Sequence, residues 1–170
     1  MTLLKKLEIF LILLFATISC NNSENKTLIN GFYEENEKGI SYKLPNDTSI
    51  IIKVNNKPII NFNDFESVIF DKDPINNSSI IFIKLDKIAS DVLLKASERN
   101  INKRLPLIFD NEILIAPVIK SKIYNGLLQI TGIDDKTSKK LIENLKQQNI
   151  KVEVKKNLFD VFDKYLENAK

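Results

Sequence analysis

The stretch RLPLIFDNEILIAPVIKSKIYNGLLQITGI, from Arg104 to Ile133, decides the fold of this chain. Two apolar runs flank the dipeptide Asp110-Asn111, a pattern typical of a hairpin with a tight type I′ turn. Both central residues of such a turn need positive φ, and Asn is the best substitute for Gly there. A third apolar run is punctuated by Gly132. The stretch therefore predicts a strand, a turn, a second strand, and a third strand that leads into a helix.

The same stretch resembles the signature of the periplasmic head subdomain of SecD, the accessory subunit of the bacterial protein-export machinery. That family's pattern is roughly LAIVLDGKVxSAPVIxxxIxxGxxxIxG, followed by a capped helix. Upstream, Pro58 to Phe65 resembles the family's xPLLTxxDI, a short turn before the first strand of the head. The resemblance extends over about Ser49 to Gln148. The residues that fall on the signature are Leu105, Ile108, Asp110, Ile113, Ala116, Pro117, Val118, Ile119, Ile123, Gly126, Ile130 and Gly132.

Two helices complete the predicted fold. Asp86 is placed to cap the first, which we expect to end near Asn100 in the left-handed conformation that Asn tolerates, and Asp134 is placed to cap the second. Apolar residues recur at helical spacing in both, as on helices that pack one face against a sheet. We predict an α+β fold, an antiparallel sheet with two helices packed on one face. The supporting residues are Ala89, Val92, Leu93 and Ala96, then Ser138, Leu141, Ile142 and Leu145, and the strands Ser49–Val54, Ser67–Phe70 and Ser79–Leu85.

The chain divides into five predicted parts. Residues 1–19 are a lipoprotein signal peptide, 20–30 a flexible tether, 31–48 a small hairpin, 49–148 the SecD head-like domain, and 149–170 an extension. In the hairpin, Gly31–Tyr33 is expected to pair with Ile40–Tyr42. The extension alternates as IKVEV, which predicts a last strand, and then continues as an amphipathic helix. Asn157 caps that helix, with Phe159, Phe162 and Leu166 on one side.

The N-terminus predicts export and a lipid anchor. Lys5 and Lys6 precede the apolar run Ile9 to Ile18, which is too short for a membrane span of about 20 residues and is typical of a signal peptide. Thr17 to Cys20 resembles a bacterial lipobox, whose Cys carries the lipid. Cys20 is the only Cys in the chain, so it has no disulfide partner. We expect Cys20 to be lipidated, with the protein facing the periplasm or cell exterior. Asn21 after it favours an outer-membrane address.

Composition excludes several classes of function. Removal of the signal takes away two Lys and one Glu, so the net charge falls from +3 to +2, and no basic nucleic-acid footprint remains. The chain has no His, the commonest general base and metal ligand. It also lacks a Gly-rich phosphate loop and a Cys cluster. We predict no cofactor, no metal and no nucleic-acid partner.

The acidic residues have simple structural interpretations. Asp110 belongs to a hairpin turn, where its carboxylate can bond backbone amides. Asp134 and Asp135 fit a helix cap and a first-turn acid. The Asp71-Lys72-Asp73 stretch offers two possible Ca²⁺ ligands but lacks the further acid and the Gly of a known loop, so a solvated loop is favoured.

The resemblance to SecD implies a domain that contacts unfolded or emerging polypeptide outside the cytoplasm. In that family, the head moves relative to a base, driven by proton flow through membrane helices that we do not find in this sequence. We predict a non-catalytic lipoprotein that binds polypeptide or an envelope protein by β-augmentation. The candidate edges are the strand Ile115, Ala116, Pro117 and Val118 and the edge near Pro106, a residue that cannot donate to a sheet ladder. A protected strand end is an equally good interpretation of Ala116–Val118.

Two alternatives stay open. The domain could be a structural or interaction subunit of an envelope complex unrelated to secretion, with the terminal helix docking a partner. A carboxylate-dependent hydrolase is the weaker alternative, because it needs two acids that converge in a pocket. Asp110 together with Asp64 or Asp71 would be such a pair.

Overall fold

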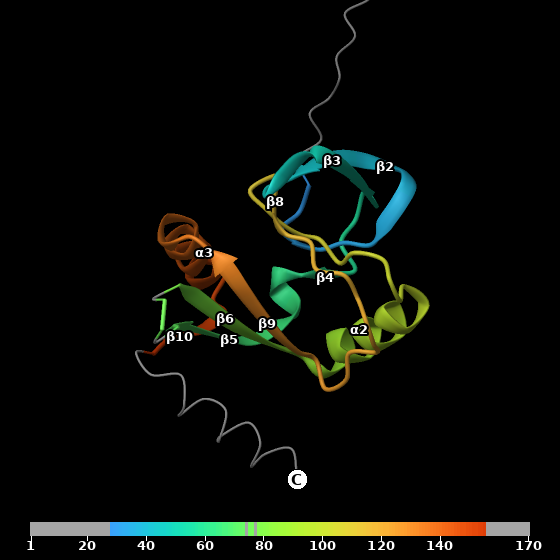
Figure 1. The fold of residues 1–170 in the computed structure, drawn as a ribbon. Helices are drawn as coiled ribbons and strands as arrows, with labels where there is room; N and C mark the ends of the chain where they lie inside the picture. Colours follow the sequence, from blue (N-terminus) through green and yellow to red (C-terminus); the bar gives the residue numbers. More distant parts are fainter. Residues whose placement is uncertain (1–27, 74, 77, 156–170) are drawn as a thin grey trace, which may run out of the picture.

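The computed structural model describes residues 28–155 except 74 and 77, and these form a mixed α+β structure (Figure 1). The described residues hold three sheets, two α-helices and one short 3-10 helix. The elements are β1 (Gly31–Phe32), β2 (Glu35–Leu44), β3 (Asp47–Val54), β4 (Ile60–Asn61), η1 (Phe62–Asp64), β5 (Phe65–Lys72), β6 (Ser79–Leu85), α2 (Lys87–Arg99), β7 (Leu107–Phe109), β8 (Glu112–Ile115), β9 (Leu127–Ile133), α3 (Asp135–Gln147) and β10 (Lys151–Val154).

The larger body of the molecule is the sheet β10-β5-β6-β9, together with α2 and α3. Both helices begin where the sequence predicts: Asp86 accepts from the N–H of Ala89, and Asp134 accepts from the N–H of Thr137. Both helices also contribute buried side chains to one core with the sheet, which confirms the predicted α+β fold. The sheet itself is mixed and not purely antiparallel, because β10 runs parallel to β5.

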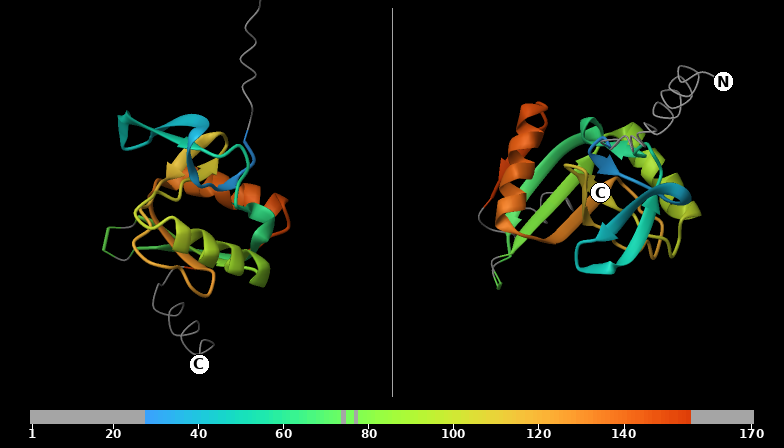
Figure 2. Two further views of the ribbon diagram at one scale, coloured as in Figure 1. Left: turned by 90° about the vertical axis from the view of Figure 1, so that its right-hand side faces the viewer. Right: turned by 90° about the horizontal axis from the view of Figure 1, so that it is seen from above.

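A second sheet, β4-β1-β7-β8, lies between this body and the β2–β3 hairpin. Figures 1 and 2 show the hairpin on the side of the molecule away from the β10-β5-β6-β9 sheet. The predicted type I′ turn is present between β7 and β8, where Asp110 has φ 54° and Asn111 has φ 63°. The third predicted strand, β9, does not continue this sheet but pairs with β6 in the other one. The Arg104–Ile133 stretch therefore contributes to both sheets.

Three local predictions are wrong. Gly31–Phe32 pairs with β4 and β7 and not with Ile40–Tyr42, whose partner is β3. A long hairpin with a turn at Pro45-Asn46 satisfies more backbone groups than the short pairing that we expected. Pro106 does not lie at an edge: it is buried just before β7, where its carbonyl accepts from the N–H of Tyr33 at 2.9 Å. At the start of a strand the missing N–H costs no ladder bond.

Helix α2 ends where predicted, with Asn100 as its C-cap, and the third error concerns only the backbone conformation of this residue. Asn100 has φ −117°, and the left-handed residue is Asn102, with φ 67°. The Asn100 side chain explains the difference, since its amide donates to the carbonyl of Ala96 and to Glu34. These bonds satisfy the helix end without a left-handed residue at that position.

A smaller core attaches the hairpin to the rest of the protein, and Tyr33 is its largest fully buried side chain. The Tyr33 hydroxyl donates to the carbonyl of Ile29 at 2.5 Å. Burial, and to a lesser degree the neighbouring Tyr42, raises the pKa of Tyr33 to about 12. The hydroxyl is therefore held neutral in the folded protein at a pH where it ionises in the unfolded chain.

This shift predicts a loss of stability at alkaline pH. The unfolded Tyr33 ionises near the ordinary tyrosine pKa of 10.0 and the folded one near 12, so its contribution is complete below pH 10 and is lost as pH rises toward 12. Urea unfolding at pH 8 and pH 11 measures this. Tyr33→Phe should cost about 1 kcal/mol at pH 8 and flatten the alkaline decline. The exposed Tyr124→Phe is the control, and an equal decline in all three proteins would contradict the assignment.

Candidate functional site

The predicted edge strand, Ile115 to Val118, begins at the last residue of β8 and continues in the same direction. Ile115 is paired with Leu107, and the chain then runs antiparallel to the segment that precedes β7. The Leu105 N–H donates to the carbonyl of Pro117 at 2.8 Å, and the Arg104 guanidinium donates to the carbonyl of Ala116 at 2.9 Å. One side of the predicted strand is thus paired within the protein.

A hollow of about 470 Å³ lies along this strand. Three parts of the chain form its walls: the end of β8, the middle of β9, and the turn of the β2–β3 hairpin. We call this hollow the two-edge groove. The lining residues are Leu44, Pro45, Asn46, Asp47, Ile50, Arg104, Ile115, Ala116, Pro117, Gln129, Ile130 and Thr131. Three of the four predicted edge residues therefore line it, and Val118 does not.

Both strands beside the groove are the last strands of their sheets. The orders β4-β1-β7-β8 and β10-β5-β6-β9 place β8 and β9 at sheet edges. An edge strand presents a row of N–H and C=O groups that can pair with another extended chain. Gln129 and Thr131 on β9 are exposed, and Ile115 and Ala116 are half-buried. The groove thus combines two edges with a mainly apolar, partly open lining.

The charged residues of this lining are engaged locally. Arg104 is bonded to the carbonyl of Ala116, as described above. Asp47 accepts from both the hydroxyl and the N–H of Ser49, and these bonds hold the pKa of its carboxyl below the usual range. The other lining residues are neutral. This chemistry suits an uncharged extended segment better than a charged ligand.

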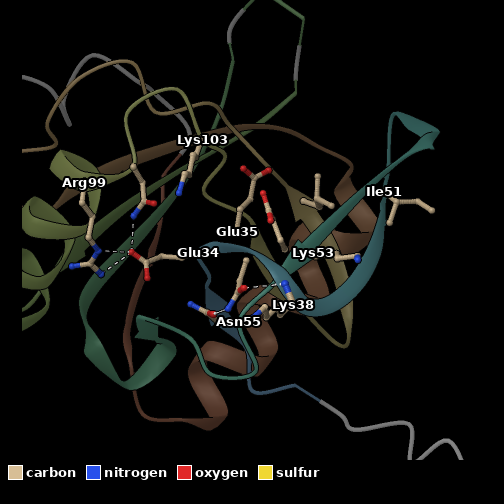
Figure 3. Close-up of a pocket in the computed structure, with 12 residues that line it drawn as sticks. Glu34, Glu35, Lys38, Ile51, Lys53, Asn55, Arg99 and Lys103 are labelled. Carbon is tan, nitrogen blue, oxygen red and sulfur yellow. Dashed lines mark hydrogen bonds and ion pairs between the residues drawn. The ribbon is translucent and has the colours of Figure 1, made fainter.

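A larger hollow of about 780 Å³ lies between the hairpin and the end of α2 (Figure 3). Charged side chains dominate its lining, and several are paired: Glu34 accepts from Arg99 and Asn100, and the Glu35 carboxylate accepts from the N–H of Arg104. Through these bonds, half-buried Glu34 links the start of the hairpin to the end of α2. A solvated surface of internal ion pairs explains this hollow without a ligand.

The acids of the hydrolase alternative do not contact one another in any bond of the described residues. Asp110 pairs with Lys140 of α3, and Asp64 completes a capping box by accepting from the N–H of Asn61. Asp71 accepts from the N–H of Lys72. Asp110 lies in the hairpin turn as predicted, but its carboxylate pairs with the side chain of Lys140 and not with the backbone amides that we expected.

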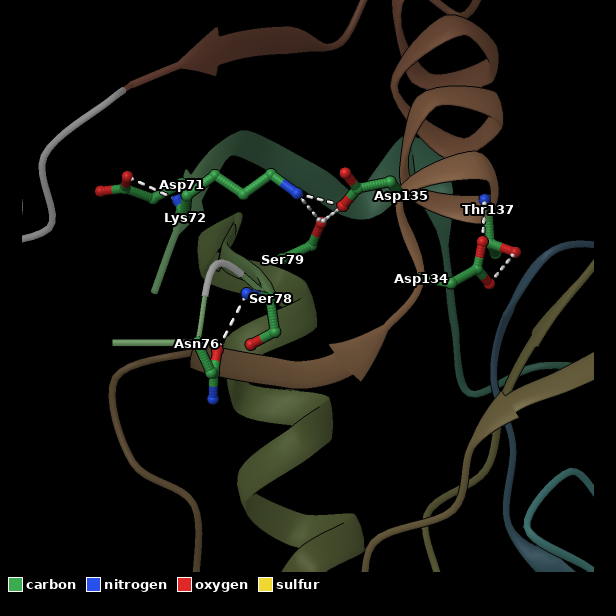
Figure 4. Close-up of polar contacts among 8 residues, drawn as sticks. All are labelled: Asp71, Lys72, Asn76, Ser78, Ser79, Asp134, Asp135 and Thr137. Carbon is green, nitrogen blue, oxygen red and sulfur yellow. Dashed lines mark hydrogen bonds and ion pairs between the residues drawn. The ribbon is translucent and has the colours of Figure 1, made fainter. Parts of the chain in front are cut away.

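The other acids also have local partners (Figure 4). Asp134 accepts from the Thr137 side chain and N–H, which lowers the pKa of its carboxyl. Asp135 pairs with Lys72, and this lowers its pKa as well. Asp73 accepts from the N–H of Ile75 in a turn, apart from buried Asp71. No group of three potential metal ligands occurs within residues 28–155 as described.

Sequence reasoning missed two walls of the groove. Gln129 to Thr131 was expected to be a strand, but nothing in its pattern shows which sheet it joins. Leu44 to Asp47 was missed because the hairpin was assigned to the wrong pair of strands. The Leu44-Pro45-Asn46-Asp47 run is a turn signal that could have located the hairpin turn.

None of the helices in the described part of the chain is both long enough and apolar enough to span a membrane. Cys20, the signal segment, and the predicted terminal helix with Asn157, Phe159, Phe162 and Leu166 lie outside the described residues.

The fold and the motif define a small α+β module of the kind found in the head of an export-associated membrane protein. The sequence profile of the SecDF P1 head subdomain matches residues 38–152, and the chain belongs to this family. The match begins at residue 38, within the segment that we expected to be a separate hairpin, and includes most of the β2–β3 hairpin. The family match confirms the resemblance to the SecD head that the sequence analysis described.

Individual relatives match only in part. The protein translocase subunit SecD of Calditerrivibrio nitroreducens is 34% identical over 56 residues, which are 33% of this chain and 11% of that protein. The chain thus spans about a tenth of the length of this curated relative.

Two solved structures share the fold. A crystal structure of SecDF in its super-membrane-facing form has a TM-score of 0.51 at 15% identity, covering 66% of this chain and 17% of that one. A structure of SecDF, described as a membrane component that enhances protein export, has a TM-score of 0.50 at 15% identity, covering 66% and 59%. At this identity the likeness shows the fold alone.

Proposed function

We propose that this protein is a membrane-anchored lipoprotein whose two-edge groove binds an extended polypeptide segment in the cell envelope, in connection with protein export. The observation that carries the proposal is that Ile115, Ala116 and Pro117, at the end of edge strand β8, line a hollow whose other wall belongs to edge strand β9. A segment added to either edge gains backbone hydrogen bonds, and the apolar lining receives alternate side chains. Binding through backbone hydrogen bonds depends little on the sequence of the bound segment, so one groove can bind many different exported polypeptides.

We also propose a role for each N-terminal part of the chain. Residues 1–19 direct export, Cys20 carries the lipid, and residues 20–30 tether the head to a membrane that we take to be the outer one. Family membership supports the export link, since the relatives are a translocase subunit and a component that enhances protein export. Lipidation and the membrane address rest on the sequence motif.

A second candidate function is a dedicated subunit of an envelope complex. Its support is β3, the outer strand of the hairpin, where Ile51 is 59% exposed and Ile50 is 37% exposed. Exposed Ile on an edge strand favours a fixed protein partner over changing ones. We infer a non-catalytic role in either case, because the acids described above serve caps, turns and ion pairs.

The groove is tested by adding a charge to its exposed wall. We expect Gln129→Lys to weaken binding of a fluorescent, uncharged extended peptide by about tenfold, because Lys on an edge strand opposes pairing and brings a charge toward an apolar hollow. Fluorescence anisotropy of the full chain in detergent measures the affinity. Gln147→Lys, at the exposed end of α3, is the matched control. Equal peptide affinities of the two variants would contradict the proposal that the groove binds polypeptide.

A further inference from the structure

The outer strand of the hairpin, β3, has β2 as its one sheet neighbour among the described strands. It is eight residues long, DTSIIIKV, and lies at the margin of the molecule, on the side away from the β10-β5-β6-β9 sheet (Figures 1 and 2). Its other edge presents backbone N–H and C=O groups that can pair with a further strand. We call this edge of β3 the hairpin edge.

The middle of β3 lacks the usual protection of a free edge. The five residues from Thr48 to Ile52 include no charge and no Pro, and four of them are β-branched, which favours strand pairing. Proteins commonly protect a free edge with charged residues or by keeping the strand short. The edge strand β10 carries Lys151 and Glu153, and the edge strand β4 has two residues. The hairpin edge is therefore suited to pairing with a partner strand.

The two sides of β3 differ. Side chains alternate along a strand, and Ile52 and Val54 belong to the smaller core. Ile51 and Lys53 lie on the opposite side, where both are exposed, and Ile51 keeps 59% of its surface in contact with solvent. This side of the hairpin thus has an apolar residue next to a charged one.

The charges of β3 indicate what pairs with it. Asp47 and Lys53 are its two charged residues; they lie on the same side, three residues before and three residues after Ile50. Lys53 forms no ion pair with any described residue, and the Asp47 carboxylate accepts only from Ser49. Each end of the strand therefore carries one charge that is free to pair with the opposite charge.

This arrangement is complementary to itself. When two copies of β3 run antiparallel with Ile50 opposite Ile50, Asp47 of each copy lies opposite Lys53 of the other, and two-fold symmetry forms this pair twice. A shift of the register by one residue would place both charges opposite uncharged residues. In the matched register the Ile51 side chains of the two copies are diagonal neighbours on the same side of the sheet.

We propose that two copies of this protein associate through the hairpin edge and form a continuous four-stranded sheet from two hairpins. Backbone hydrogen bonds join the two β3 strands, and the two pairs of Asp47 with Lys53 fix the register. The Ile51 side chains shield each other from solvent. This inference goes beyond the proposed function and holds whether or not the two-edge groove binds polypeptide.

Zero-length crosslinking tests the contact directly. The purified full chain in detergent micelles is treated with a carbodiimide, which joins a carboxylate to an amine in contact with it. Within one chain, Asp47 and Lys53 are six residues apart on an extended strand, about 20 Å, so a crosslink between them requires two copies. We expect mass spectrometry to find the peptide that contains Asp47 joined to the peptide that contains Lys53.

Exchange of the charges tests the register. Lys53→Asp and Asp47→Lys should each weaken dimerisation at least about tenfold, because like charges then lie opposite each other at two sites. An equimolar mixture of the two variants should dimerise like the wild type, since opposite charges face each other again, and this result also shows that both variants fold. Lys57→Asp, an exposed change just after β3, is the matched control and should dimerise normally. Sedimentation equilibrium in density-matched detergent measures the association.

Four results would overturn the proposal. One is a monomer without the crosslink at every protein concentration. Another is a dimer that Lys53→Asp weakens no more than Lys57→Asp does, which would place the contact on a different surface. The third is a mixture of the two charge variants that associates no better than either variant alone. The fourth is a crosslink from Lys53 to a different, copurifying envelope protein in place of a second copy.

Discussion

The Cys20→Ala variant is expected to leave the membrane fraction almost completely. A diacylated Cys holds a protein durably, because each buried methylene contributes about 0.8 kcal/mol and two chains act together. Without the thiol no lipid can be attached, and the apolar run Ile9 to Ile18 is too short to span the membrane alone. Cell fractionation, with detection of the protein in both fractions, measures the effect.

Fatty-acid labelling makes this test specific. The wild-type protein should incorporate a labelled fatty acid and Cys20→Ala should incorporate none. Ser23→Ala, a similarly small change in the tether, should behave like the wild type. Absence of label from the wild type, or a Cys20→Ala protein that stays with the membrane, would contradict the proposed anchor.

The second large effect is expected in the core. Phe62 is 2% exposed, and its ring lies 5.1 Å from that of Phe65 and 6.1 Å from that of Phe109, between centroids. Phe65 begins β5 in one four-stranded sheet and Phe109 ends β7 in the other. Phe62→Ala therefore opens a cavity where the two sheets meet, and it should lower the free energy of unfolding by about 3–5 kcal/mol.

Urea denaturation followed by circular dichroism measures this loss. Ile88→Ala removes a side chain that is 77% exposed on α2, and it should change stability by less than about 0.5 kcal/mol. Similar losses in the two variants would mean that the Phe cluster does not hold the sheets together.

Local signals predicted the helices and the central turn well. Asp86 and Asp134 predict where the two helices begin, because a helix cap depends on only three or four neighbouring residues. The dipeptide Asp110-Asn111 predicts the hairpin turn for the same reason. Sheet membership was harder: β9 follows β8 in the chain but pairs with β6, and no short pattern records that choice.

The groove follows the same division between local and long-range information. Ile115 to Pro117 could be identified as a candidate edge from the family signature. Its opposite wall on β9 and the hairpin turn at Pro45-Asn46 come from long-range pairings. Pro106 misled the prediction, because Pro is tolerated both at a sheet edge and just before a strand.

The most direct test of the central claim is photocrosslinking in living cells from a photoreactive residue at position 115. The same residue at position 124 is the control, since Tyr124 is exposed and lies outside the groove lining. The account predicts crosslinks from position 115 to many exported chains in transit, and few from position 124. Crosslinks from position 115 to one envelope protein only, or the same pattern from both positions, would contradict polypeptide binding in the groove.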